Sequence, residues 1–212
     1  MDDIFDTRFE EKPLAVADNL VQAGQDINIS AKDPTLKNLL LGAGWDLNIF
    51  GSDSLDVDVS LFLLNKSGQT RVDEDFVFYN QKQTLNGGVK HLGDSRTGAG
   101  EGDDEALLLD LHTIPFDIMR VAIVISIYKG YEKKQALESV RRAYIRIVNN
   151  DTRHEICRYE LDKALTDRQE TAMIAGYLDR EGPKWHFKPL ADFMEGGLGG
   201  VARQYGLVIN QE

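Results

Sequence analysis

Apolar residues after about Leu20 recur mostly at every second position, in short runs bounded by Gly, Asn, Asp or Ser. This period is typical of strands that bury one face. The run from Ile118 to Tyr128 is apolar on both faces, which is typical of a central strand. We expect strands at Ile27/Ile29, Val57 to Leu63, Val77/Tyr79, Ile118 to Tyr128, Tyr144 to Val148, Glu155 to Leu161, Thr171 to Leu178 and Trp185 to Pro189.

Helical spacing occurs in two stretches, Glu132 to Arg141 and Leu198 to Tyr205, where apolar residues recur three and four positions apart. The stretch Thr171 to Leu178 also suits a helix. About eight to ten short strands without a repeated strand–helix–strand unit favour two antiparallel sheets. The pattern therefore predicts a mostly β fold, an antiparallel two-sheet β-sandwich with one or two short helices.

The length of 212 residues fits one domain. Residues 1–19 are rich in acids and have few periodic apolar positions, so we expect an acidic, loosely ordered N-terminal leader. Residues 20–212 are expected to form the single folded domain.

Acidic residues outnumber basic ones by 35 to 24, which gives a net charge of −11. This balance disfavours nucleic acid as a ligand and favours cations.

The single cysteine, Cys157, is expected to be a small core residue, and the acidic N-terminus lacks the features of a signal peptide. The longest apolar run is far short of the ~20 residues that span a bilayer. We therefore expect a cytoplasmic protein without direct membrane insertion.

The segment from Asp94 to Glu105 contains five acidic residues and three glycines. Glycines allow backbone carbonyls to turn inward and carboxylates supply hard oxygens, which together suit a calcium ion. The segment is not an EF-hand, because Arg96, Gly98 and Ala99 occupy positions where that loop needs other residues. Zinc is disfavoured because the four histidines and the cysteine lack ligand spacing. A solvated acidic loop is the alternative.

Further oxygen donors lie upstream. Asp56 and Asp58 are two positions apart in a strand pattern and so share one face, and Asp46 and Asn48 have the same spacing. Asn80 ends another apolar run. Two like charges 4 Å apart repel by ~4 kcal/mol at an effective dielectric of 20, so converging carboxylates need a cation or raised pKa values.

Several motifs resemble the TerD family of tellurium-resistance and general-stress proteins, over about residues 20–207. The resemblance rests on Gly44-Trp45-Asp46-x-Asn48, Leu55-Asp56-Val57-Asp58-Val59-Ser60, Asp75-Phe76-Val77-Phe78-Tyr79-Asn80 and, above all, Gly93-Asp94-Ser95-Arg96-Thr97-Gly98-x-Gly100-x-Gly102-Asp103-Asp104-Glu105. It continues through Tyr144 to Asn149, Arg158-Tyr159, Thr171 to Ile174 and Gly197-Leu198.

The resemblance implies a cytosolic, non-enzymatic, calcium-binding β-sandwich that protects bacteria from tellurite, phage and other stresses. It implies two neighbouring Ca²⁺ ions, with one ion as the alternative. Its expected partners are other stress-response proteins, membrane-associated ones being one option. The implied ligands are Asp46, Asn48, Asp56, Asp58, Asn80, Asp94, Glu101, Asp103, Asp104 and Glu105, with a carbonyl from Gly98. Ser95, Ala99 and Glu101 depart from the commonest family loop, which leaves one carboxylate fewer.

Three hypotheses about function follow. In the first, Ca²⁺ orders acidic loops that present a surface to partners. The second is a metal-free interaction module with an acidic docking face, whose binding would survive chelation. The third is a Mg²⁺- or Mn²⁺-dependent phosphoesterase, which requires a pocket beside the acids. The absence of Gly-x-Ser-x-Gly and His-Glu-x-x-His motifs points away from catalysis.

Two other features have simpler interpretations. Residues 129–146 carry six basic and two acidic residues, which we interpret as a solvated face rather than a docking surface for an acidic partner or anionic lipid. The run Gly196 to Gly200 lacks the Lys-Ser/Thr of a P-loop and is interpreted as a turn into the last helix.

Overall fold

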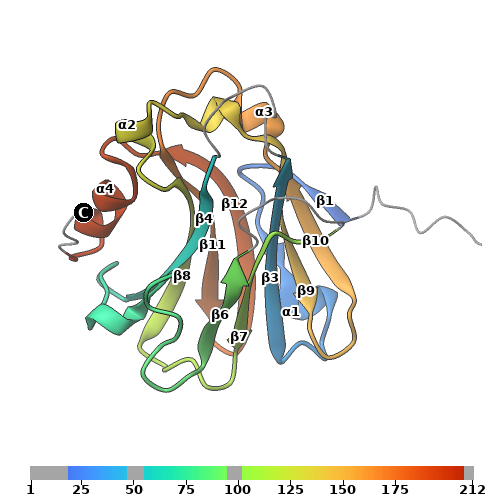
Figure 1. The fold of residues 1–212 in the computed structure, drawn as a ribbon. Helices are drawn as coiled ribbons and strands as arrows, with labels where there is room; N and C mark the ends of the chain where they lie inside the picture. The colour runs from blue at the N-terminus through green and yellow to red at the C-terminus, as the bar shows by residue number, and fades with distance from the viewer. Residues whose placement is uncertain (1–18, 47–54, 95–101, 208–212) are drawn as a thin grey trace, which may run out of the picture.

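Two six-stranded sheets face each other in the computed structural model, which describes residues 19–46, 55–94 and 102–207 (Figure 1). The first sheet contains, in spatial order, β1 (Leu20–Val21), β10 (Glu155–Glu160), β9 (Arg141–Asn149), β3 (Asn38–Asp46), β7 (Glu105–Asp110) and β6 (Val89–Asp94). The second contains β2 (Ile27–Asn28), β12 (Lys184–Phe193), β11 (Ala172–Glu181), β8 (Ile118–Ile127), β4 (Val57–Asn65) and β5 (Phe76–Val77).

Neighbouring strands pair antiparallel, except that β1 runs parallel to β10. The predicted two-sheet sandwich is confirmed. No helix among the described residues has the length and apolar character needed to cross a lipid bilayer.

The alternation in β4 decides which side chains enter the core. Val57, Val59, Leu61 and Leu63 belong to the main apolar cluster between the sheets. Phe62 points to the opposite face, because successive strand residues face opposite sides of a sheet. Both faces of β8 are buried between β4 and β11, as predicted for a central strand.

Among the described residues, only one helix is longer than a single turn, α4 (Gly197–Gln204), which confirms the predicted helix at Leu198 to Tyr205. It lies against the outside of the second sheet, where Val201, Ala202 and Tyr205 join an apolar cluster with Phe62 (Figure 1). The single-turn helices are α1 (Ile29–Lys32), α2 (Gly130–Lys133) and α3 (Asp162–Leu165), and two short 3-10 turns span Asp73–Asp75 and Leu137–Ser139.

The predicted helix from Glu132 to Arg141 is wrong. Lys134 has a left-handed backbone (φ +52°) that ends α2. The chain then makes a separate 3-10 turn and enters β9 at Arg141. The ambiguous stretch from Thr171 to Leu178 forms most of β11.

The end of β3, at Asp46, and the start of β4, just after Asp56, lie at the same end of the sandwich, the upper end in Figure 1. Register places Ala43 opposite Glu105 in the first sheet and Val57 opposite Ile127 in the second. A hydrogen bond between the Glu105 side chain and the Val59 N–H shows that both sheets contribute to the same end.

Candidate metal centre

Asp104 is fixed to the end of β3 by two hydrogen bonds. Its N–H donates to the Ala43 carbonyl at 2.7 Å, and its Oδ2 accepts from the Trp45 N–H at 2.8 Å. Burial raises the pKa of the Asp104 carboxyl, and the negative charges of Asp46 and Asp103 raise it further. The charged form of Asp104 is therefore disfavoured in the metal-free site, and a cation bound there would stabilise it.

Asp103 is held by an arginine on the outer side of the first sheet. Its carboxylate forms a bidentate pair with Arg146, with distances of 2.8 and 2.9 Å, and accepts from the Tyr144 hydroxyl at 3.1 Å. It lies directly over Gly42, where a Cβ atom would come within 2.1 Å of Oδ2. Because charge-assisted bidentate pairs are strong, Asp103 is already partly neutralised.

Glu105 joins the two sheets. It is 1% exposed, and its Oε2 accepts from the Val59 N–H of β4 at 2.5 Å. The buried His91 of β6 places its Nε2 3.6 Å from the same oxygen. Glu105 thus has a structural role in addition to any metal binding.

Two predicted ligands share a cavity of ≈ 450 Å³. Asp58 lies on the face of β4 opposite the main core, and Asn80 follows β5. Both residues line the cavity. Asp56 immediately precedes β4, and its backbone carbonyl accepts from the Tyr128 N–H at 2.8 Å. Asp46 lies at the rim of the first sheet and pairs with Arg142 at 2.9 Å.

The predicted ligands therefore fall into two groups. Asp46, Asp103 and Asp104 lie near one another, with Glu105 next in the chain, whereas Asp58 and Asn80 line the cavity on the second sheet. The backbone of Asp94 pairs with Glu105 across β6 and β7. Asn48, Gly98, Glu101 and the Asp94 side chain lie outside the described part of the chain. The donors are carboxylate and amide oxygens, a chemistry that fits Ca²⁺ or Mg²⁺.

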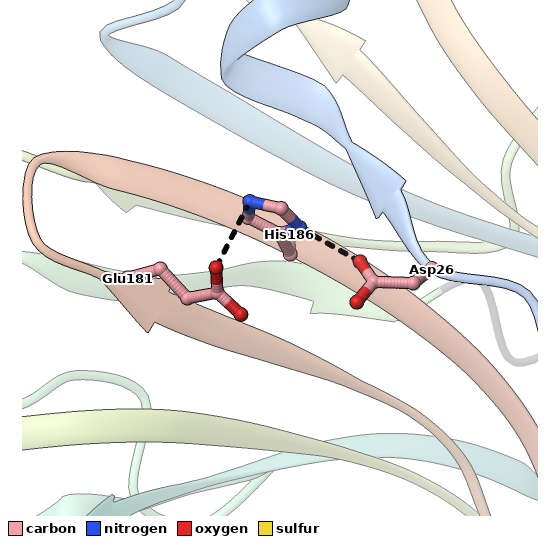
Figure 2. Close-up of side chains that lie close together, drawn as sticks. All are labelled: Asp26, Glu181 and His186. Atoms are coloured by element: carbon pink, nitrogen blue, oxygen red, sulfur yellow. Dashed lines mark hydrogen bonds and ion pairs between the residues drawn. The ribbon is translucent and has the colours of Figure 1, made fainter.

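A second cluster, which the sequence analysis missed, contains Asp26, Glu181 and His186 (Figure 2). Asp26 Oδ1 lies 2.7 Å from Nδ1 of His186, and Glu181 Oε2 lies 3.6 Å from Nε2. The hydrogen bond with His186 lowers the pKa of Asp26, and Lys188, 3.4 Å from Asp26, lowers it further against the opposing effect of burial.

The ammonium of Lys188 also lies 3.9 Å from Glu181 and 3.1 Å from Asp179. The cluster therefore contains its own cation, and we interpret it as an ion-pair network. The pairing of His186 with Asn28 across β12 and β2 brings the side chains of this cluster together. Spacing in the sequence gives no signal for such a long-range pair.

The fold and these donors define a β-sandwich protein with an acidic, oxygen-rich end. The chain belongs to the TerD family, because the TerD domain profile matches residues 19–205. It is 38% identical over 184 residues to the tellurium resistance protein TerD of Serratia marcescens, covering 87% of this chain and 95% of that protein. It is 39% identical over 187 residues to general stress protein 16U of Bacillus subtilis, covering 88% and 96% of the two chains.

Solved structures share the fold. A homologue of a telluride resistance protein (TerD) from Streptomyces coelicolor superposes with a TM-score of 0.62 at 16% identity, covering 77% of this chain and 93% of that one. A second structure, of a protein of unknown function, gives a TM-score of 0.59 at 19% identity and covers 73% and 87%.

Proposed function

We propose that this stress-resistance family member is a non-enzymatic, cytoplasmic Ca²⁺-binding protein, in which the ion orders acidic loops that present a surface to other stress-response proteins. Relatives named for tellurium resistance and general stress support the stress role. The acidic end of the sandwich supports the choice of ion.

The observation that carries the proposal is the environment of Asp104. This carboxylate is buried, its pKa is raised, and Asp46 and Asp103 add negative charge nearby. A divalent cation relieves such a cluster. Bound Ca²⁺ would supply positive charge and connect strand ends to loops.

The proposed ligands differ in how freely they can serve. Asp46 contributes from the end of β3, Asp104 from just before β7, Asp58 from β4 and Asn80 from the segment after β5. Four of the proposed ligands would share an oxygen with another residue: Asp46 with Arg142, Asp103 with Arg146, Asp104 with the Trp45 N–H and Glu105 with the Val59 N–H. The remaining donors are those of the motif series: Asn48, Asp56, Asp94, Glu101 and the Gly98 carbonyl.

Calorimetric titration of chelator-stripped protein with Ca²⁺ and with Mg²⁺ tests the proposal. We expect Ca²⁺ to bind more tightly, and Asp104→Asn to weaken binding about tenfold or more because one charged ligand is lost. Asp167→Asn is the matched control, since Asp167 is exposed and has a left-handed backbone that Asn tolerates. No heat with Ca²⁺, or equal affinity in Asp104→Asn, would refute the proposed site.

The cavity beside Asp58 is a feature that a metal-dependent phosphoesterase would require. That alternative predicts release of phosphate from phosphomonoesters in Mg²⁺ or Mn²⁺ and its loss in Asp58→Asn. Our proposal predicts no turnover above the rate without protein.

A further inference from the structure

His186 lies between two carboxylates, and each of its ring nitrogens faces one of them (Figure 2). Its neighbours in the chain, Trp185 and Phe187, belong to the main core, so the imidazole is on the opposite face of the second sheet. Asp26 approaches from the segment before β2, and Glu181 is the last residue of β11. Strand pairing therefore brings together three side chains that have no local spacing in the sequence.

The hydrogen bond with Asp26 decides which nitrogen of His186 carries the proton. Asp26 Oδ1 lies 2.7 Å from Nδ1, and the pKa of Asp26 is lowered, so this carboxylate is ionised at neutral pH. An ionised carboxylate only accepts hydrogen bonds, and Nδ1 is therefore the donor. A neutral imidazole has one ring hydrogen, so Nε2 then carries a lone pair.

Two acceptors consequently face each other on the other side of the ring. Nε2 lies 3.6 Å from Oε2 of Glu181, which is beyond the usual length of a hydrogen bond. Two ligands bound to one zinc ion at about 2.1 Å, in tetrahedral geometry, are about 3.4 Å apart. The separation between Nε2 and Oε2 is thus close to that of two ligands of one metal ion.

Lys188 leaves these two atoms to each other. Its ammonium approaches the second oxygen of each carboxylate, Oδ2 of Asp26 at 3.4 Å and Oε1 of Glu181 at 3.9 Å. The oxygens that face the imidazole are Oδ1 and Oε2. The ion-pair network of the metal-free protein therefore does not use the pair formed by Nε2 and Oε2.

The charges around the ring also favour a cation. The cluster and its neighbours contain three carboxylates, of Asp26, Asp179 and Glu181, and the two cations that pair with them are Lys188 and Arg120. While the imidazole is neutral, these side chains carry one negative charge in excess. A bound cation would compensate that charge.

We propose that His186 and Glu181 bind a divalent transition-metal ion of the zinc class through Nε2 and Oε2, while Asp26 orients the imidazole. Imidazole nitrogen suits zinc, whereas Ca²⁺ prefers oxygen ligands. A metal-bound histidine commonly donates its other ring N–H to a carboxylate, which fixes the ring and makes it a stronger ligand. This site differs from the acidic end in place and in metal class, and it does not depend on the proposed calcium function.

Titration with Zn²⁺ in excess Ca²⁺ tests the inference. The chelator-stripped full-length protein is first given Ca²⁺ to occupy the acidic end and is then titrated calorimetrically with Zn²⁺ at pH 7.5. We expect one Zn²⁺ per chain. Absence of zinc binding overturns this inference and leaves the calcium function standing, whereas zinc binding without calcium binding overturns only the calcium function.

Two variants and a control locate the metal. His186→Gln removes the imidazole and should weaken Zn²⁺ binding about tenfold or more, and Asp26→Asn should weaken it about tenfold because the orienting carboxylate is lost. His112→Gln removes an exposed histidine in the turn after β7 and should leave the affinity unchanged. Equal affinity in His186→Gln and the parent overturns the site, and equal affinity in Asp26→Asn overturns the orienting role.

Nitrogen NMR of the histidine rings needs no variant. In the metal-free protein at pH 7.5, we expect His186 to be neutral with its proton on Nδ1, and Zn²⁺ should shift the Nε2 resonance. A proton on Nε2 in the metal-free protein would complete the contact with Glu181 without a metal and would overturn the inference.

Discussion

Arg146 holds the carboxylate of Asp103 through two nearly equal hydrogen bonds, from Nε to Oδ1 at 2.8 Å and from Nη2 to Oδ2 at 2.9 Å. Asp103 belongs to the acidic segment that the sequence predicts to bind metal. The absence of a side chain at Gly42 leaves room for this pair on the sheet. A cation at the acidic end therefore competes with Arg146 for one of its ligands.

Replacing this arginine should strengthen calcium binding. In Arg146→Gln the Asp103 carboxylate loses its bidentate partner, so we expect the affinity for Ca²⁺ to rise about tenfold. The free energy of unfolding of the chelator-treated protein should fall by about 1–3 kcal/mol, because charge-assisted hydrogen bonds are lost. Calorimetry and urea denaturation measure the two effects.

Arg153→Gln is the matched control for the change in net charge, since Arg153 is exposed. An equal change in affinity in both variants would attribute the effect to net charge. Unchanged affinity in Arg146→Gln would remove Asp103 from the ligands.

Removing the carboxylate that joins the sheets should destabilise the protein. Glu105→Ala takes the acceptor away from the Val59 N–H and leaves a gap beside the buried His91. We expect the free energy of unfolding to fall by about 2–4 kcal/mol, measured by urea denaturation in chelator. Glu105→Gln keeps an acceptor oxygen and should lose less. A loss under ~0.5 kcal/mol in Glu105→Ala would contradict the bridging role.

The buried carboxyl of Asp33 should make stability depend on pH. Burial acts to raise its pKa, but hydrogen bonds from Thr35 and Asn149 outweigh it and lower the pKa to about 2. The folded value lies below the unfolded value of about 3.9, so the contribution is present above pH ~4 and is lost as pH falls toward about 2.

Asp33→Asn should therefore be less stable than the parent by about 2 kcal/mol at pH 6, with the difference shrinking as the pH falls from 4 to 2. Urea denaturation at a series of pH values measures this. A difference that stays constant over the range would contradict the assignment.

Cys157 should resist alkylation in the folded protein. Its side chain is fully buried, and burial raises the pKa of the thiol to about 12. Because the thiolate is the reactive form, iodoacetamide should label the native protein slowly at pH 8 and the urea-unfolded protein rapidly. Mass spectrometry follows the labelling. Full native labelling within minutes would contradict the core position.

The sequence predicted strands well where apolar residues at every second position mark a strand with one face in the main core, as in β4. It did not identify β3, in which Leu39 to Trp45 are buried without alternation. Gly42 and Gly44 occupy that strand because Asp103 and the Tyr144 ring lie against them. These close contacts are made by residues that are distant in the sequence, so a local hydrophobic pattern cannot predict them.

The acidic site was predictable as a set of donors but not as an arrangement. Clustering of Asp103, Asp104 and Glu105 in one segment is visible in the sequence. The bonds to Arg146, Trp45 and Val59 that restrain these acids depend on long-range strand pairing. The fold likewise brings Thr171 beside Gly197 at the start of α4, where both residues line the cavity.

Thermal unfolding of the chelator-stripped protein, with and without Ca²⁺, tests most directly whether calcium stabilises the acidic end. At a hundred times the dissociation constant, one site adds ~2.7 kcal/mol to the free energy of unfolding. For a chain of this size, that corresponds to a rise in melting temperature of about 5–10 °C. We predict such a rise with Ca²⁺ and a smaller one with equal Mg²⁺. Identical melting temperatures in Ca²⁺ and in chelator would contradict the account.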